Sequence, residues 1–268
     1  MNFNFYYGAA SGSSRKALRQ LEEPNIMINY ATEKNKPWSG IENLFIDSGG
    51  YSFMLGKGEY GTTDRKYLEF VEKHQSKLFA LRDYPCEPDV LEENGRTVRD
   101  HLEATTRKHR NLLGLLPEFD IQAQPVSVIQ GWELEDYLEH LEMLKQHDLL
   151  TDYVAVGSVC RRNQDEKIQR IINEIHKRIG DRKLHAFGVK SNILRFSDMR
   201  EKMDSADSNA FDMAARYSDN KVDGRGFQNC ALEYLKFKKN INSMLSSNSK
   251  VSIDESQQRL EEVRSSGE

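Results

Sequence analysis

The segment Ile46–Tyr51, with the sequence IDSGGY, is the most informative part of the chain. It continues the apolar residues Leu44 and Phe45, so it predicts a buried strand that ends in a carboxylate, a hydroxyl and two glycines. Glycine lets the backbone approach a flat ligand closely, and barrel enzymes keep their active sites at carboxyl strand ends. The segment therefore predicts a site of chemistry. A turn capped by an aspartate is the plainer interpretation of the same residues.

The pattern around this segment predicts eight strands that mostly alternate with helices. We expect strands at residues 3–7, 26–30, 44–47, 77–83, 125–131, 153–159, 184–189 and 203–207. We expect helices at about 15–22, 64–74, 97–116, 134–144, 168–179, 193–202 and 227–244. This alternation favours an α/β fold of the (β/α)8 TIM-barrel type over an open doubly wound sheet.

The chain length is consistent with one barrel domain. Its 268 residues fit one large barrel or two small domains, and we expect the barrel to occupy residues 1–244. Residues 245–268 are rich in serine and charge and almost without apolar residues, which predicts a disordered polar tail.

Composition limits the class of protein. The chain has 38 basic and 42 acidic residues and a net charge of −4, which excludes a globally cationic nucleic-acid binder but not a local basic patch. No apolar run approaches the roughly 18 residues of a membrane span, and the first residues lack a signal-peptide pattern. We therefore expect a cytoplasmic protein, in the host cytoplasm if it is viral, with no membrane partner.

The cysteines predict neither disulfides nor a metal site. Cys86, Cys160 and Cys230 are odd in number and widely spaced, so we expect reduced thiols, no bound metal and no cofactor.

Polar residues and glycines recur at the predicted carboxyl ends of the strands. They are Asp47, Asp83, Gln130, Gly157, Gly188 and Asp207. Because these strand ends meet on one face of a barrel, we expect the residues to form one site.

Four of these positions lie in motifs that resemble the tRNA-guanine transglycosylase superfamily. The Asp47–Tyr51 segment resembles the family's DSGG(F/Y) box, which carries an active-site aspartate. Residues 128–131, VIQG, resemble the strand whose glutamine contacts the base, and residues 78–84 resemble the strand with the base-recognising aspartate. Residues 154–159 match the family's IGG segment in part, with Ser158 in place of the second glycine.

The segment from Gly188 to Asp207 extends the resemblance. Its spacing from the glycine to the last aspartate fits the family pattern without a gap, which implies that Asp207 is the nucleophile. Asp204, three residues earlier, is the alternative nucleophile. The resemblance covers residues Asp47 to Phe211.

The chain departs from the tRNA-acting members at the zinc site. Those enzymes carry a CxCxxC motif and a later histidine, whereas this chain has only Cys230 in that region and no histidine after His185. It therefore looks more like the relatives that insert 7-deazaguanines into DNA, without the zinc-binding subdomain. Such relatives occur in phages and in prokaryotic gene clusters.

The resemblance implies a base exchange with two carboxylates in different roles. Asp207 would attack C1′ of a deoxyguanosine, Asp47 would protonate the leaving guanine, and a 7-deazaguanine such as preQ0 would displace the carboxylate. The residues implied to bind the base are Ser48, Gly49, Tyr51, Asp83, Gln130, Gly157, Ser158 and Gly188. Tyr51 is expected to stack on the purine.

Plainer interpretations apply to several of these residues. Asp204 and Asp207 could cap the helix that follows them, and His185 on a buried strand is more typical of a hydrogen-bonded core histidine. Arg161, Arg162 and Arg216, and also Arg82, are candidates to contact phosphates, although a solvated face is the usual place of such charges.

Three other functions fit the same motifs. Exchange of guanine in tRNA needs the same carboxylates, and a nucleoside or base glycosidase would use them with water as the acceptor. A barrel that serves as a non-catalytic binding subunit is the third.

The expected partners are DNA, or alternatively tRNA, a 7-deazaguanine base and helper proteins that open the duplex, while the sequence leaves the oligomeric state open.

Overall fold

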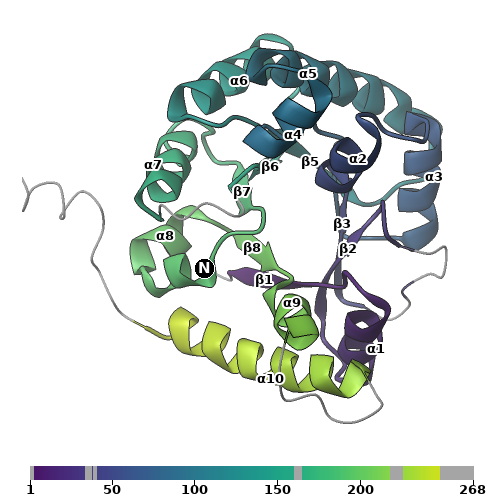
Figure 1. The fold of residues 1–268 in the computed structure, drawn as a ribbon. Coiled ribbons are helices and arrows are strands. Elements are labelled where there is room, and N and C mark those ends of the chain that lie inside the picture. Colours follow the sequence, from purple (N-terminus) through teal and green to yellow (C-terminus); the bar gives the residue numbers. More distant parts are fainter. Residues whose placement is uncertain (1–2, 34–37, 39–40, 160–164, 218–225, 248–268) are drawn as a thin grey trace, which may run out of the picture.

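The chain folds into a closed barrel of eight parallel strands (Figure 1). The computed structural model describes residues 3–33, 38, 41–159, 165–217 and 226–247. The strands are β1 (Asn4–Gly8), β2 (Asn25–Asn29), β3 (Asn43–Asp47), β4 (Leu78–Ala80), β5 (Gln124–Ile129), β6 (Tyr153–Val156), β7 (Lys183–Ala186) and β8 (Ser205–Ser208). Each pairs with the next in the chain, and β8 returns to pair with β1. The predicted (β/α)8 barrel is therefore confirmed.

Helices form a ring outside the strands (Figure 1). They are α1 (Gly12–Gln20), α3 (Asp64–His74), α5 (Val98–Leu115), α6 (Leu134–Gln146), α7 (Asp165–His176), α8 (Ser197–Lys202) and α10 (Gly226–Leu245). Side-chain caps begin two of these helices: Ser11 accepts from the backbone N–H of Ser14, and Thr63 accepts from that of Lys66. Residues 248–268 lie outside the described part, so the tail stays a prediction.

The helix predicted at about 193–202 is divided into the 3₁₀ helix η2 (Ser191–Arg195) and α8. Four short elements were not predicted: α2 (Gly50–Lys57), α4 (Pro88–Asn94), α9 (Ala210–Tyr217) and the 3₁₀ helix η1 (Leu116–Glu118). None is longer than eight residues, which is too short for helical periodicity to stand out. In Figure 1, α2 and α4 lie inside the ring of outer helices, close to each other.

Several strands are shorter than predicted. β4 ends at Ala80 rather than at residue 83, and β6 ends at Val156 rather than at residue 159. The first loop residues after these strands are also buried, so the burial expected of a strand continues beyond its last residue. The extra residues therefore belong to the loops that carry the polar groups.

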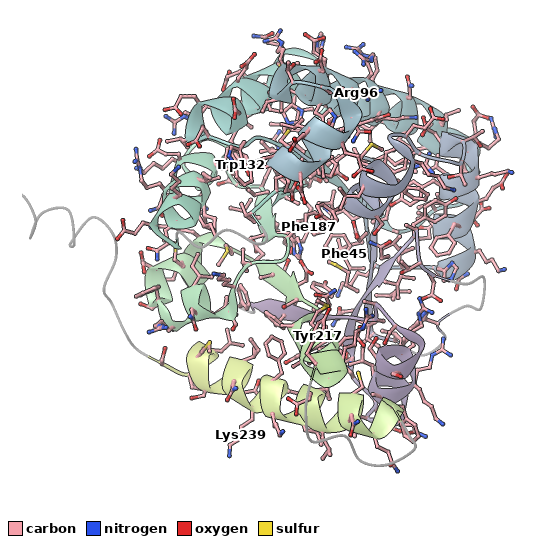
Figure 2. All side chains as sticks on the ribbon, viewed as in Figure 1. Phe45, Arg96, Trp132, Phe187, Tyr217 and Lys239 are labelled. Atoms are coloured by element: carbon pink, nitrogen blue, oxygen red, sulfur yellow. The ribbon has the colours of Figure 1, made fainter. Side chains whose placement is uncertain are left out.

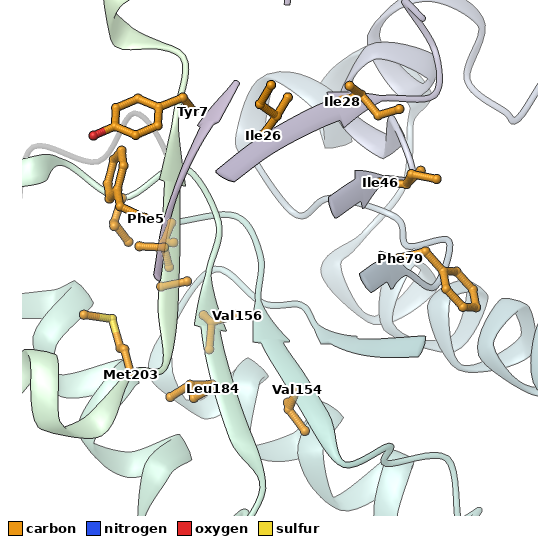
Figure 3. Close-up of a cluster of buried hydrophobic side chains, with 14 of the residues drawn as sticks. Phe5, Tyr7, Ile26, Ile28, Ile46, Phe79, Val154, Val156, Leu184 and Met203 are labelled. Carbon is orange, nitrogen blue, oxygen red and sulfur yellow. The ribbon is translucent and has the colours of Figure 1, made fainter. Parts of the chain in front are cut away.

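Alternation along the strands divides the core into two layers. On β1, Phe5 and Tyr7 face the helices, whereas Tyr6 faces the barrel interior with Phe45 of β3. Figure 3 shows part of the outer layer, including Ile28 of β2. Inside the barrel, large and small side chains fill the space, so the interior is a packed core rather than a pore.

Polar contacts attach the last helix to the barrel. The buried carboxylate of Glu23, after α1, accepts hydrogen bonds from Tyr234 and Lys238 of α10. Helix α10 also lies against α1 and α9, so it closes the ring beside β1 (Figure 1). Among the described residues, no helix combines the length and the apolar character of a membrane span.

The buried layer between strands and helices predicts a strong packing effect. Ile28→Ala removes a fully buried side chain from this layer and is expected to lower the free energy of unfolding by about 2–5 kcal/mol. Leu232→Ala, at a side chain that is 48% exposed on α10, is the matched control and is expected to change it by less than about 0.5 kcal/mol. Urea unfolding measures both, and equal effects would contradict the assignment of the core.

Candidate active site

Three carboxylates share the carboxyl end of the barrel. Asp47 is the last residue of β3, Asp83 lies three residues beyond β4, and Asp207 lies near the end of β8. The negative charges of Asp83 and Asp207 both raise the pKa of Asp47, so both groups lie within electrostatic reach of Asp47. The strand-end residues predicted to meet therefore do so for these aspartates.

Asp47 is held by an asparagine on the neighbouring strand. Asn29 is the register partner of Asp47, and its Nδ2 donates to Asp47 Oδ2 at 2.6 Å. The amide orientation is set because Asn29 Oδ1 accepts from the backbone N–H of Ala31 at 2.9 Å. Gly49 N donates to Asp47 Oδ1 at 3.3 Å.

The surroundings of Asp47 make it a weak acid. Burial is the largest cause that raises its pKa, followed by the charge of Asp83, and the total brings the pKa to about 7. The hydrogen bonds from Gly49 and Asn29 oppose this rise only in part. A carboxyl group with this pKa can give and take a proton near neutral pH.

Glycines allow the strand to turn directly into α2. Gly49 has a φ of +79°, and a Cβ on it would lie 2.8 Å from Ala31 Cβ. A Cβ on Gly50 would lie 2.7 Å from the backbone oxygen of Asp83. Both positions of the GG pair therefore require glycine, for backbone conformation at the first and for close packing at both.

Asp83 is buried and accepts from two side chains. Ser48 Oγ donates to Oδ1 at 2.7 Å, and Gln130 Nε2 donates to Oδ2. Burial raises the pKa of Asp83 to about 6, although the hydrogen bonds from Ser48 and Gln130 lower it. Tyr60 fixes the backbone here, since its hydroxyl donates to Asp83 O at 2.8 Å and accepts from Asp83 N at 3.0 Å.

The buried carboxylate of Glu87 is linked to Gln130 through the hydroxyl of Ser158. Gln130 Oε1 lies 2.7 Å from Ser158 Oγ, which also lies 2.6 Å from Glu87 Oε2. Gly157 makes room for the glutamine, because a Cβ there would lie 2.3 Å from Gln130 Nε2. The network thus joins the loops after β4, β5 and β6.

Side chains of α5 and α6 hold the backbone of two of these loops. Thr105 accepts from Tyr84 N at 2.9 Å, and the ring of His101 bonds to Pro85 O at 2.6 Å. His140 Nδ1 accepts from Gln130 N at 2.8 Å, and burial lowers its pKa to about 3, which keeps it a neutral acceptor.

Asp207 is oriented by β7 and the turn after it. The backbone N–H of Gly188 donates to Asp207 Oδ1 at 2.8 Å, and His185 Nε2 lies 3.3 Å from the same oxygen. Gly188 has a φ of +59°, which aims its N–H at the carboxylate. Gly188 therefore positions Asp207, and its implied contact with the base stays a prediction.

Asp204 does not belong to this cluster. It precedes β8, and its Oδ2 accepts from the backbone of Leu184 near the start of β7 at 2.9 Å. That places Asp204 at the amino end of the barrel, opposite Asp207. The geometry therefore places Asp207, and not Asp204, beside Asp47, while the identity of the nucleophile stays a prediction.

Other candidates have structural partners. Tyr51 donates to Asp89 Oδ2 at 2.9 Å, linking α2 to α4. Arg82 is fully buried and pairs with Asp64 at 2.9 Å, so it is not available to a phosphate. Arg216 pairs with the buried Asp212 at 2.7 Å. Arg161, Arg162 and Cys160 lie outside the described residues.

Sequence reasoning missed four residues of the site. They are Asn29, Tyr60, Glu87 and His185 as a partner of Asp207. Asn29 ends β2 and lies one residue before the end of the predicted strand, so the rule that selected the aspartates could nearly have found it. Tyr60 and Glu87 follow no motif, since only the fold brings their loops to Asp83. In the described part of the chain, no group of three or more metal-ligating side chains is suited to a metal ion.

The fold and this site define a barrel of enzyme-like architecture, with acidic groups at the carboxyl ends of its strands. The chain matches the family described as DpdA, DeoxyPurine in DNA protein A, over residues 33–257, and it therefore belongs to that family. The resemblance predicted from the sequence is confirmed, and the family indicates a DNA-modifying role with DNA as the substrate. No match was found among curated proteins.

The raised pKa of Asp47 predicts a pH-dependent cost to stability. A carboxyl with a folded pKa of about 7 favours folding in its protonated form, so this contribution is lost as pH rises from about 4 through 7. Asp47→Asn, which keeps an acceptor for Asn29, is expected to stabilise the protein by about 2 kcal/mol more at pH 8 than at pH 5. Urea unfolding at both pH values tests this, with the exposed Asp152→Asn as control. An equal effect at the two pH values would contradict it.

The contact between Gly157 and Gln130 predicts strain from a single methyl group. Gly157→Ala is expected to destabilise the protein by about 1–3 kcal/mol, because the new Cβ displaces the glutamine amide from Asp83. Gly114→Ala is the matched control, since that glycine lies in α5 with open space around it and alanine favours the helix by about 0.8 kcal/mol. Thermal unfolding of both variants checks this. An unchanged stability of Gly157→Ala would show that the loop moves to make room for the methyl group and would contradict the prediction.

Proposed function

We propose that the chain exchanges guanine in DNA for a 7-deazaguanine through a covalent aspartyl-deoxyribose intermediate. One observation carries the proposal: a hydrogen-bonded carboxylate, Asp207, shares its site with Asp47, whose pKa of about 7 suits a proton donor. Two carboxyl groups with different surroundings are what a nucleophile and a general acid require. Membership of the family supports DNA as the substrate.

The first half of the reaction breaks the bond between the sugar and the base. Asp207 attacks C1′ of the deoxyribose, the C1′–N9 bond breaks, and its electron pair leaves with guanine. Protonated Asp47 gives its proton to the departing base, so that guanine leaves neutral. Asp47 is then ionised, and the deoxyribose is held as an ester of Asp207.

The second half runs the same steps in the opposite direction. A 7-deazaguanine such as preQ0 enters, its N9 attacks C1′, and the ester bond to Asp207 breaks. The ionised Asp47 accepts the N9 proton, which restores both carboxyl groups. No cofactor is needed to balance the exchange.

Asp83 is proposed to recognise the base. Its carboxylate can accept from the N1 and N2 donors of guanine, and 7-deazaguanines present the same edge, so one pocket serves both bases. Ser48 and Gln130 already hold this carboxylate in place, at 2.7 Å in the case of Ser48. The target nucleotide must leave the DNA stack to reach these groups, at a cost of a few kcal/mol in a duplex.

The test is nucleoside mass spectrometry on DNA and tRNA. The chain would be expressed in a host that makes preQ0 and lacks its own transglycosylase, and both nucleic acids would be digested and analysed. A deaza-deoxyguanosine in DNA is expected with the wild type and is expected to fall at least about 1,000-fold with Asp207→Asn, which cannot form the ester.

Asp204→Asn is the matched control for this test. Its new amide oxygen can still accept from Leu184 N, so the fold and the activity are expected to persist. A deazaguanine only in tRNA would assign the substrate to tRNA, and free guanine without incorporation would indicate a glycosidase. Modification that survives Asp207→Asn would overturn the proposed nucleophile.

A further inference from the structure

Three polar side chains from neighbouring strands form a buried line that ends at Asp207. Tyr153 of β6 bonds to Ser205 Oγ of β8 at 2.6 Å, and Ser205 Oγ bonds to Nδ1 of His185 of β7 at 2.8 Å. The other ring nitrogen of His185, Nε2, lies 3.3 Å from Asp207 Oδ1. His185 and Ser205 are register partners, so the barrel ladder itself sets the central contact.

The line lies in the interior of the barrel, away from solvent. His185 and Ser205 are fully buried, and Tyr153 is 4% exposed. The imidazole packs edge-on against Phe45 and Phe187, with ring centroids 4.9 and 4.5 Å away, and Figure 2 places both phenylalanines near the middle of the barrel. Because such groups must satisfy one another, the direction of each hydrogen bond can be derived.

One arrangement of protons satisfies every group in the line. Asp207 Oδ1 also accepts from Gly188 N, so it is an acceptor, and His185 Nε2 must carry a proton to bond to it. A neutral ring then has a lone pair at Nδ1, which accepts from Ser205. Ser205 in turn accepts from Tyr153, whose pKa is raised by burial, so it keeps its proton.

The other arrangements leave a group unsatisfied. A neutral ring protonated at Nδ1 would point the Nε2 lone pair at a carboxylate oxygen. A charged ring would donate to Ser205, and Ser205 to Tyr153, which leaves the tyrosine proton without an acceptor among the described residues.

We propose that His185 is a positioning residue that is held in its Nε2–H tautomer by Ser205 and Tyr153 and fixes the carboxylate of Asp207. His185 and Gly188 both bond to Oδ1, and within the described residues no hydrogen bond reaches Oδ2. Oδ2 is therefore the oxygen that attacks the sugar. This role in the reaction rests on the proposed function, whereas the tautomer does not.

The tautomer is tested without any substrate. Long-range ¹H–¹⁵N correlation spectra of protein with ¹⁵N-labelled histidine distinguish Nε2–H, Nδ1–H and doubly protonated rings. The chain has seven histidines, and the signals lost in His185→Gln assign the ring in question. The Nε2–H pattern is expected for this ring, and either other form would overturn the proposal.

The positioning role is tested by kinetics of base exchange. His185→Phe fills the volume but donates no hydrogen bond, and it is expected to lower kcat about 100-fold with KM changed less than about twofold. His185→Gln keeps a donor at the reach of Nε2 and is expected to recover at least about tenfold of that loss. Tyr6→Phe is the control, since Tyr6 packs against the ring but takes no part in the line.

The outcomes separate this proposal from the proposed function. Full kcat in His185→Phe, or an equal loss in the Phe and Gln variants, would overturn the positioning role. A wild type that exchanges no base but shows the Nε2–H tautomer would overturn the proposed function and leave the hydrogen-bonded line supported.

Discussion

The gathering of three carboxylates at one end of the barrel is the constraint on which the site depends. Burial raises the pKa of Asp47 and of Asp83, and the negative charges of Asp83 and Asp207 raise that of Asp47 further. Each therefore needs hydrogen-bond donors of its own. Asn29 serves Asp47, Ser48 and Gln130 serve Asp83, and Gly188 and His185 serve Asp207.

Burial and neighbouring charge, more than the number of donors, distinguish Asp47 from Asp83 chemically. Asp47 keeps a pKa of about 7 because burial and the charge of Asp83 outweigh its two hydrogen bonds. Asp83 also has a raised pKa, but two side-chain donors hold it nearer its usual range. A barrel suits such a site because each strand end brings one group to a common face while the packed interior keeps the strands rigid.

The barrel interior links packing to the site. Successive residues of β8 place Ser205 inside the barrel and Asp207 two residues further along the same face. His185 is at once part of the packed interior, among Phe45 and Phe187, and a partner of Asp207. The interpretation of His185 as a hydrogen-bonded core histidine is confirmed. Its hydrogen bond to Asp207 joins the packed interior to the site.

Local sequence determined the barrel and most of the face that carries the site. The period of two in strands and the longer period in helices follow from backbone geometry, so eight strands could be predicted, and Asp47, Asp83 and Asp207 could be placed at their ends. The tertiary structure alone decided the partners. Asp204 and Asp207 are three residues apart, yet they lie at opposite ends of β8, and Glu87 reaches Gln130 through Ser158 of a distant loop. Such contacts depend on barrel closure and loop paths, which join residues far apart in the chain and leave no periodic mark in the sequence.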